Sequence, residues 1–252
     1  MRGRVSSVRK DILRKRITHK RITYLFQWNR TNHRLFVSDS APHDFARPLW
    51  DFLERVYRDD IPHDLFSRND FGRASSMRLP SIPKSRETDL AYQLAKEGLV
   101  SLESSSELLK LVKKVTRSST SHGSVLSFLL NFDPNSIASE VPVYSEELKL
   151  TGHIDLLRLR SGGTVEVLDF KPGLRDVSLL LAVPQVAAYG VLLQRIIPSI
   201  SGHIQCTLFN SQESVSFGPE ILETLGGDAL SSVTQDKERV HRLYQSTLDL
   251  HF

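Results

Sequence analysis

Two stretches decide the fold of this chain: Gly152-His-Ile-Asp155-Leu-Leu157 and Val165-Glu-Val-Leu-Asp169-Phe-Lys171. Both are rich in apolar residues, and the sequence Ser161-Gly-Gly163 between them is typical of a tight hairpin connection. A hairpin places neighbouring strands side by side, so residues in the two stretches can lie close together. We therefore predict that the two aspartates, Asp155 and Asp169, meet at one edge of a sheet.

The two aspartates predict a particular chemistry. Converging carboxylates repel each other unless a cation lies between them, and hard oxygen ligands select Mg²⁺ or Mn²⁺. Because side chains alternate along a strand, Lys171 shares the face of Asp169, whereas Glu166 points to the other face. Lys171 could stabilise charge on a pentavalent phosphate or position an attacking water, which phosphodiester hydrolysis requires. A bare D-x-K is usually a surface ion pair; its place after an apolar strand favours a site.

The elements around the hairpin predict an α+β fold. From about residue 106 to 209 the order is helix, three-stranded meander, helix, strand, which indicates a mostly antiparallel sheet covered by helices. The expected helices are 44–58, 86–99, 106–116, 123–132, 184–197 and 228–248; the expected strands are 22–28, 34–37, 141–144, 148–159, 164–170, 203–209 and 215–217.

Composition shifts suggest three parts: a basic arm (1–21), an N-terminal β/α module (22–85) and a main domain (86–252) with its core at about 106–210. The boundary near residue 85 follows a stretch rich in proline, glycine and serine, which we expect to be irregular.

Composition also excludes several classes of protein. The single cysteine, Cys206, excludes an internal disulfide, a cysteine-ligated zinc site and an iron–sulfur cluster. No apolar run approaches the roughly 18–20 residues that cross a bilayer, and no apolar segment follows the first charges. There is no GxxxxGK phosphate loop. We expect an intracellular protein without a membrane partner, cytoplasmic if prokaryotic or viral, with a nuclear or organellar location left open.

The net charge of +4 is unevenly distributed. Residues 1–21 carry +8 and the remainder of the chain −4. Such an arm suggests a polyanion as partner, and a solvated tail is the alternative. The basic residues of the arm are Arg2, Arg4, Arg9, Lys10, Arg14, Lys15, Arg16, Lys20 and Arg21.

A second pair of polar residues follows Lys171 by fourteen positions, in Gln185-Val-Ala-Ala-Tyr189. Positions i and i+4 lie on one face of a helix. The amide and the phenol could therefore orient the lysine or contact a DNA backbone or base. The alternative is an ordinary helix with a polar first turn and a half-buried tyrosine.

Taken together, G-x-I-D, D-F-K and Q-x-x-x-Y in this order resemble the PD-(D/E)xK nuclease superfamily, in particular its RecB-type branch, over about residues 106–210. The resemblance implies a restriction-endonuclease-like core with Mg²⁺ or Mn²⁺. It implies that Asp155, Asp169 and the Phe170 carbonyl bind the metal and that Lys171 is catalytic. Gln185 and Tyr189 would match the extra motif of the branch.

The chain departs from that branch at two points. Many members hold an iron–sulfur cluster with four cysteines, which Cys206 alone cannot do. Many also carry a metal-binding histidine on the first core helix, for which His122 is the best-placed candidate. Glu140, before the first expected core strand, is a weaker candidate for a ligand, and His153 is at most a neighbour of the metal ligands.

The resemblance favours a nuclease acting on DNA, as an exonuclease on single strands or ends, with endonuclease action left open. A catalytically inactive nucleic-acid-binding protein with the same fold is the first alternative, because a basic arm alone can bind phosphates. The other alternative is an unrelated α+β protein. A protein partner or a homo-oligomer is also compatible with the regions outside the core.

Overall fold

The computed structural model describes residues 11–37, 43–79, 84–117, 121–172 and 179–226. The strands are β1 (Ile12–His19), β2 (Ile22–Asn29), β3 (Gly72–Arg73), β4 (Ser101–Glu103), β5 (Ser136–Ser145), β6 (Leu150–Arg160), β7 (Thr164–Phe170), β8 (Ile204–Phe209) and β9 (Ser214–Phe217). The helices are α1 (Arg30–Val37), α2 (Ala46–Arg58), α3 (Lys84–Lys96), α4 (Glu107–Thr116), α5 (His122–Phe132), α6 (Val183–Ile196) and α7 (Ile221–Gly226), with 3₁₀ turns η1 (His63–Phe66), η2 (Ala74–Ser76), η3 (Leu179–Ala182) and η4 (Pro198–Ile200).

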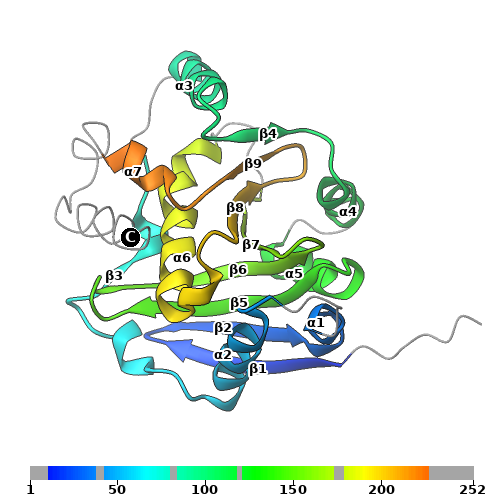
Figure 1. Cartoon of the computed structure of the whole chain (residues 1–252), viewed down its shortest axis with the longest axis vertical. Helices are drawn as coiled ribbons and strands as arrows, with labels where there is room; N and C mark the ends of the chain where they lie inside the picture. The colour runs from blue at the N-terminus through cyan, green and yellow to red at the C-terminus, as the bar shows by residue number, and fades with distance from the viewer. Residues whose placement is uncertain (1–10, 38–42, 80–83, 118–120, 173–178, 227–252) are drawn as a thin grey trace, which may run out of the picture.

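One sheet organises the described residues, in the order β1-β2-β5-β6-β7-β8-β9-β4, with β3 beside β6 (Figure 1). The strands β5, β6 and β7 form the expected antiparallel meander, and β8 pairs with β7 in parallel. A parallel neighbour needs a crossover, which α6 supplies. The predicted order of helix, meander, helix and strand is confirmed.

Each face of the sheet is covered by helices. On one face α6 packs against β5–β8 and joins the larger apolar cluster, which includes Val165 and Val167 of β7. On the other face α4 and α5 pack on Leu168 and Phe170. Side chains of β7 therefore alternate between the two layers, as the sequence predicted.

The central helix α6 is mostly apolar and almost completely buried, as expected of a helix without a broad solvent face. Together with η3 it gives an 18-residue stretch, Leu179–Ile196, that is long and apolar enough to cross a membrane, which the sequence analysis did not anticipate. In the fold 83% of this stretch is buried, as is usual for a core helix.

The N-terminal region differs from expectation. The segment 34–37 is helical within α1 rather than a strand. Its polar residues explain why: Asn29 Oδ1 accepts from the Asn32 backbone N–H, which caps this helix. The strand β1 occupies residues 12–19 of the expected arm and pairs with β2, which in turn pairs with β5. In the described part of the chain, β1 and β2 thus extend the core sheet instead of forming a module of their own.

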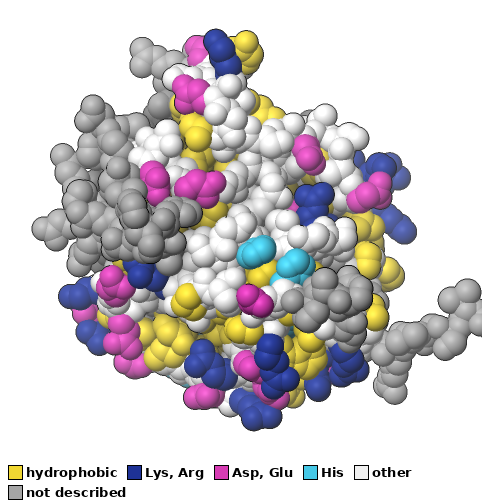
Figure 2. Space-filling view, viewed as in Figure 1, with side chains coloured by type: hydrophobic (Ala, Val, Ile, Leu, Met, Phe, Trp, Pro, Cys, Tyr) yellow, Lys and Arg dark blue, Asp and Glu magenta, His cyan; other side chains and the backbone are white. Residues whose placement is uncertain are grey.

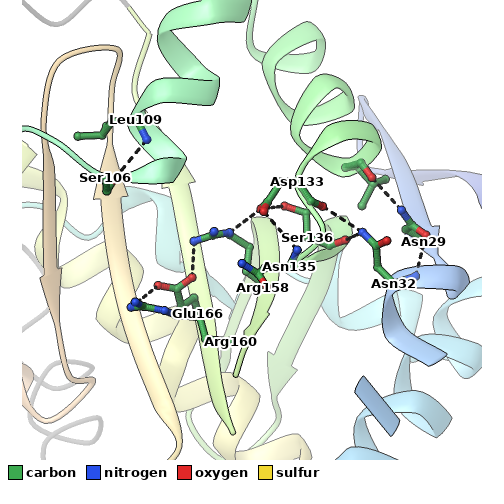
Figure 3. A network of polar contacts seen from close by, with 11 residues as sticks. Asn29, Asn32, Ser106, Leu109, Asp133, Asn135, Ser136, Arg158, Arg160 and Glu166 are labelled. Carbon is green, nitrogen blue, oxygen red and sulfur yellow. Dashed lines mark hydrogen bonds and ion pairs between the residues drawn. The ribbon is translucent and has the colours of Figure 1, made fainter. Parts of the chain in front are cut away.

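A network of buried hydrogen bonds and ion pairs connects this N-terminal region to the core (Figure 3). Asn32 donates to two carbonyl oxygens of the turn between α5 and β5, and Asn29 donates to a carbonyl of α5. In the same turn the Asp133 carboxylate accepts from Arg158 of β6 at 2.7 Å, and Arg158 also pairs with Glu166 of β7. As predicted, Glu166 points away from the candidate site.

The expected helices 44–58, 86–99, 106–116, 123–132 and 184–197 correspond to α2 to α6, with ends that differ by a few residues. The expected core strands are also present, and β5 is longer than predicted because it begins at Ser136. The expected helix 228–248 lies outside the described residues.

Candidate active site

The candidate site lies in a cavity of about 460 Å³, within the roughly 300–1,000 Å³ typical of ligand pockets. Four of the predicted residues line it: Asp155, Asp169, Lys171 and His122. Three further predicted residues line it as well: Phe170 at the end of β7, and Gln185 and Tyr189 on α6.

An irregularity in the pleat of β5 and β6 brings together the first two carboxylates of the site, those of Glu140 and Asp155. Glu140 of β5 has a φ of +53°, and Asp155 faces it in the register of β6. On either side of this point residues three apart, such as Ala138 and Val141, face the same apolar cluster, whereas a regular strand would alternate them. A left-handed φ is costly for a residue with a side chain, and such strain gathers at functional positions.

His122 meets both of these carboxylates from the first turn of α5. Its Nε2 lies 3.4 Å from Asp155 Oδ1 and 3.5 Å from Glu140 Oε1. Ligand atoms of the three residues all lie within 4.8 Å of one another. Although burial opposes it, the two carboxylates raise the pKa of His122 from 6.5 to about 10. Burial, in turn, raises the pKa of Glu140.

Glu140 was expected before the first core strand, and this placement was wrong. It lies in the middle of β5, because that strand begins five residues earlier than its most apolar segment indicated. The pleat break that turns Glu140 into the cavity has no signature in the sequence.

Asp169 takes part in a different set of contacts. Its Oδ1 accepts from Gln185 Nε2 at 2.9 Å, and its Oδ2 pairs with Lys171 Nζ. Burial and the charge of Asp155 raise the pKa of Asp169 from 3.8 to about 7. The backbone N–H of Phe170 donates to Asp155 Oδ2 at 2.8 Å. Asp155 of β6 and Asp169 of β7 therefore lie at one site, as expected.

Gln185 is the residue that links α6 to the strand end. Its Oε1 accepts from Lys171 Nζ at 3.2 Å, while its Nε2 donates to Asp169 and to the Tyr189 hydroxyl. Tyr189 is buried, and burial raises its pKa well above 10. The amide therefore holds the lysine and the aspartate in fixed positions, which is one of the two roles that the sequence left open.

The donor set fits a divalent cation. One imidazole and two carboxylates converge. Asp169 lines the same cavity, and because its carboxylate is buried, a positive charge nearby is favourable. Carboxylate oxygens suit Mg²⁺ and Mn²⁺, and carboxylates make up most of this donor set. When bound, such an ion supplies Lewis-acid polarisation of a phosphate oxygen and activation of water.

The cavity has a second half, of which sequence reasoning identified only His153, as at most a neighbour of the metal ligands. It is lined by His19 of β1, Tyr24 of β2, Phe66 of η1, His153 of β6, and Arg73, Ser75 and Arg78 of the irregular segment. In the sequence these residues lie in three separate segments. The pairing of β2 with β5 brings the first segment to the core, and the pairing of β3 with β6 brings the second.

The expected basic arm is placed away from this cavity in its described part. Only His19 of residues 11–21 lines the cavity. Arg14 and Arg16 alternate with the buried Ile17 and are exposed, and Lys20 lies in the turn before β2. Lys15 pairs with Asp59. Charges of both signs gather over α2 and β1 (Figure 2), so this face is not uniformly basic. Arg9 and Lys10 lie outside the described residues.

A sequence model of the PD-(D/E)XK nuclease superfamily matches residues 51–250. The chain belongs to this superfamily, which confirms the resemblance of its motifs at the level of the superfamily. Its mixed fold, with a mostly antiparallel sheet between helices, is consistent with the restriction-endonuclease-like core. No curated protein and no solved structure matches the chain.

Proposed function

We propose that this protein is a Mg²⁺- or Mn²⁺-dependent deoxyribonuclease that hydrolyses phosphodiester bonds in single-stranded DNA or at DNA ends. Membership of the superfamily implies a nuclease acting on nucleic acid. The observation that carries the proposal is the convergence of His122, Glu140, Asp155, Asp169 and Lys171 on one cavity. We infer an exonuclease of the RecB type from the Gln185 and Tyr189 pair, with DNA repair or recombination as its setting inside the cell.

Each residue has a proposed role. His122, Glu140 and Asp155 would hold the cation, together with Asp169 and the Phe170 carbonyl. Lys171 would stabilise the negative charge that develops on the phosphate or position the attacking water. Gln185 keeps the lysine in reach, because it also anchors Asp169 and is itself fixed by Tyr189.

The test is incubation of labelled single- and double-stranded DNA with the protein in Mg²⁺, Mn²⁺ or EDTA. We expect cleavage with either metal and none with EDTA. Asp169→Asn should be inactive, whereas Asp51→Asn, an exposed aspartate on α2, should cleave like wild type. A closed single-stranded circle has no ends, so an exonuclease should spare it. Cleavage in EDTA would contradict the metal mechanism, and binding without cleavage under every condition would favour the inactive, nucleic-acid-binding alternative.

The ligand set is tested separately by calorimetric titration of Mn²⁺. Asp155→Asn and Glu140→Gln each remove one negative charge with little change in shape, so affinity for Mn²⁺ should fall sharply. Gln185→Ala should leave Mn²⁺ binding nearly intact and lower turnover. The opposite pattern would show that these roles are wrongly assigned.

The role of the basic arm is also a proposal. We infer that Arg9, Lys10, Arg14, Lys15, Arg16, Lys20 and Arg21 add contacts to DNA phosphates. Because residues 12–19 form β1, truncation should end at Lys10 to spare the sheet. The truncated protein should bind DNA more weakly at low salt and show a shallower dependence of log K on log salt. An unchanged slope would mean that Arg9 and Lys10 do not contact phosphates.

A further inference from the structure

The half of the cavity that lies beyond the candidate metal ligands is built from aromatic rings. We call His19, Tyr24, Phe66 and His153 the aromatic wall. Tyr24 stacks on His153 with centroids 3.6 Å apart and planes 9° from parallel, and His19 stacks on Phe66 at 3.9 Å and 12°. The four residues come from β1, β2, η1 and β6, so the wall exists only in the folded chain.

Hydrogen bonds hold the histidines of the wall in place. His19 Nδ1 lies 2.9 Å from His153 Nε2, and its Nε2 lies 3.0 Å from His63 Nδ1. These stacked and hydrogen-bonded side chains therefore present ring surface to the cavity. His19 and Phe66 are buried, whereas Tyr24 remains partly exposed to the cavity.

Positive charge is supplied by two arginines at the same cavity. Arg73 is the last residue of β3 and Arg78 lies shortly after η2, and both line the cavity. Among the residues that the structure describes, neither forms an ion pair with a carboxylate, although many other exposed arginines do, for example Arg47, Arg58 and Arg68. A guanidinium group is suited to a phosphate because it can donate two parallel hydrogen bonds.

Aromatic rings beside positively charged arginines are the combination that binds single-stranded nucleic acid. In a duplex both faces of a base are covered by neighbouring bases, so only an unpaired or extruded base can stack on a protein ring. We propose that the aromatic wall, with Arg73 and Arg78, is a subsite for an unpaired nucleotide of single-stranded DNA. The base stacks on Tyr24 and the arginines bind the adjoining phosphates.

The position of the wall relates this subsite to the cleavage site. His153 precedes Asp155 by two residues on β6, and both line the one cavity. A strand held at the wall therefore passes directly to the candidate metal ligands. The identity of the ligand as DNA rests on the proposed function. Such a subsite would favour single strands and frayed ends over paired duplex as substrate.

Binding is measured in EDTA, so that no cleavage is needed, by the fluorescence anisotropy of a labelled oligothymidylate of about ten nucleotides. Tyr24→Leu should weaken binding about tenfold or more, because loss of one stacking ring has effects of this size. Tyr24→Phe keeps the ring and should bind like wild type, as should Tyr92→Leu, which alters an exposed tyrosine on α3. A blunt hairpin duplex should bind Tyr24→Leu and wild type equally. The proposal would be overturned if Tyr24→Leu and wild type bound the oligothymidylate equally. It would also be overturned if Tyr24→Leu lost as much affinity for the duplex as for the oligothymidylate.

The arginines are tested by salt dependence. Arg73→Gln and Arg78→Gln should each reduce the slope of log K against log salt by about 0.7, the value for one phosphate contact on a single strand. An unchanged slope in both variants would overturn their role in the subsite.

A third measurement uses the wild-type protein and so does not depend on the stability of any variant. A 2-aminopurine placed in turn at each position of the oligothymidylate should lose fluorescence at one position on binding, because stacking on a ring quenches it. Undiminished fluorescence at every position would overturn the subsite. A protein that binds in this way but never cleaves would refute the nuclease proposal alone, and one that cleaves with no effect of Tyr24→Leu would refute the subsite alone.

Discussion

Gly152 is the position at which the smallest change should have the largest consequence for the site. A Cβ at this residue would lie 2.5 Å from Cε1 and 2.7 Å from Cδ1 of the Tyr189 ring, and 3.4 Å from the Ala74 Cβ. Ordinary contacts between carbon atoms are about 3.5–4.0 Å. The glycine of the G-x-I-D motif is therefore required by the close approach of α6, since the ring of Tyr189 occupies the space of its side chain.

Gly152→Ala should force the Tyr189 ring to move by about 1 Å. Tyr189 is only 2% exposed, so the ring cannot turn into solvent and the core must absorb the strain. Overpacking of this kind costs about 1–3 kcal/mol. The same movement should break the 2.9 Å hydrogen bond from Gln185 to the hydroxyl and release the amide that holds Asp169 and Lys171.

The assay combines unfolding in urea with cleavage of single-stranded DNA. We expect Gly152→Ala to lose about 1–3 kcal/mol of unfolding free energy and most of its activity, while binding of Mn²⁺ at His122, Glu140 and Asp155 is largely kept. Gly123→Ala is the matched control, because a Cβ there meets nothing within 4 Å. In a double-mutant cycle, Tyr189→Ala should offset part of the loss, since it removes the clash. Purely additive losses, or a Gly152→Ala protein with wild-type stability and activity, would refute the reasoning.

Three further results are expected. Lys171→Ala should abolish cleavage and leave the circular-dichroism spectrum unchanged, because a lysine at a strand end adds little packing; a lost spectrum would make it a structural residue. Arg158→Leu leaves the buried Asp133 carboxylate without its cation and Glu166 with Arg160 alone, at 3.5 Å, and should cost about 3–5 kcal/mol in urea unfolding; a change under about 1 kcal/mol would contradict the network. Burial lowers the pKa of His33 from 6.5 to about 3, so the stability that its neutral ring contributes is fully present above pH 6.5 and is lost as the pH falls towards 3. His33→Gln should flatten the pH dependence of unfolding by about 1.4 kcal/mol per pH unit in this window, and identical slopes would exclude this role.

The core of the fold could be predicted from local patterns. Strand alternation around Asp169 separated the face of Val165 and Val167 from that of Glu166, and the structure keeps this separation. The glycine turn fixed the pairing of β6 with β7, and with it the approach of Asp155 to the strand end. Short-range periodicity suffices here because each of these relations depends on neighbours along one hairpin.

The N-terminal region could not be predicted in the same way. Residues 34–37 have the apolar character of a strand but continue a helix, because Asn29 caps it and Asn32 binds the turn after α5. The basic residues of β1 indicated a free arm, and only the ladder with β2 shows that they belong to a sheet edge. The contacts that join this region to the core, from Asn32 to Asp133 and from β2 to β5, connect segments about a hundred residues apart, so a local sequence pattern does not indicate them.

The sequence by itself determined the class of the protein, the meander and the grouping of Asp155, Asp169, Lys171 and Gln185, because these follow from strand pairing and from one helical turn. Only the tertiary structure decided that Glu140 turns into the cavity, since a left-handed residue in a strand depends on the packing around it. It also decided that the aromatic wall stands beside the carboxylates. Its residues come from strands and turns distant in the chain, and the free energy of packing them against β6 is a property of the whole sheet.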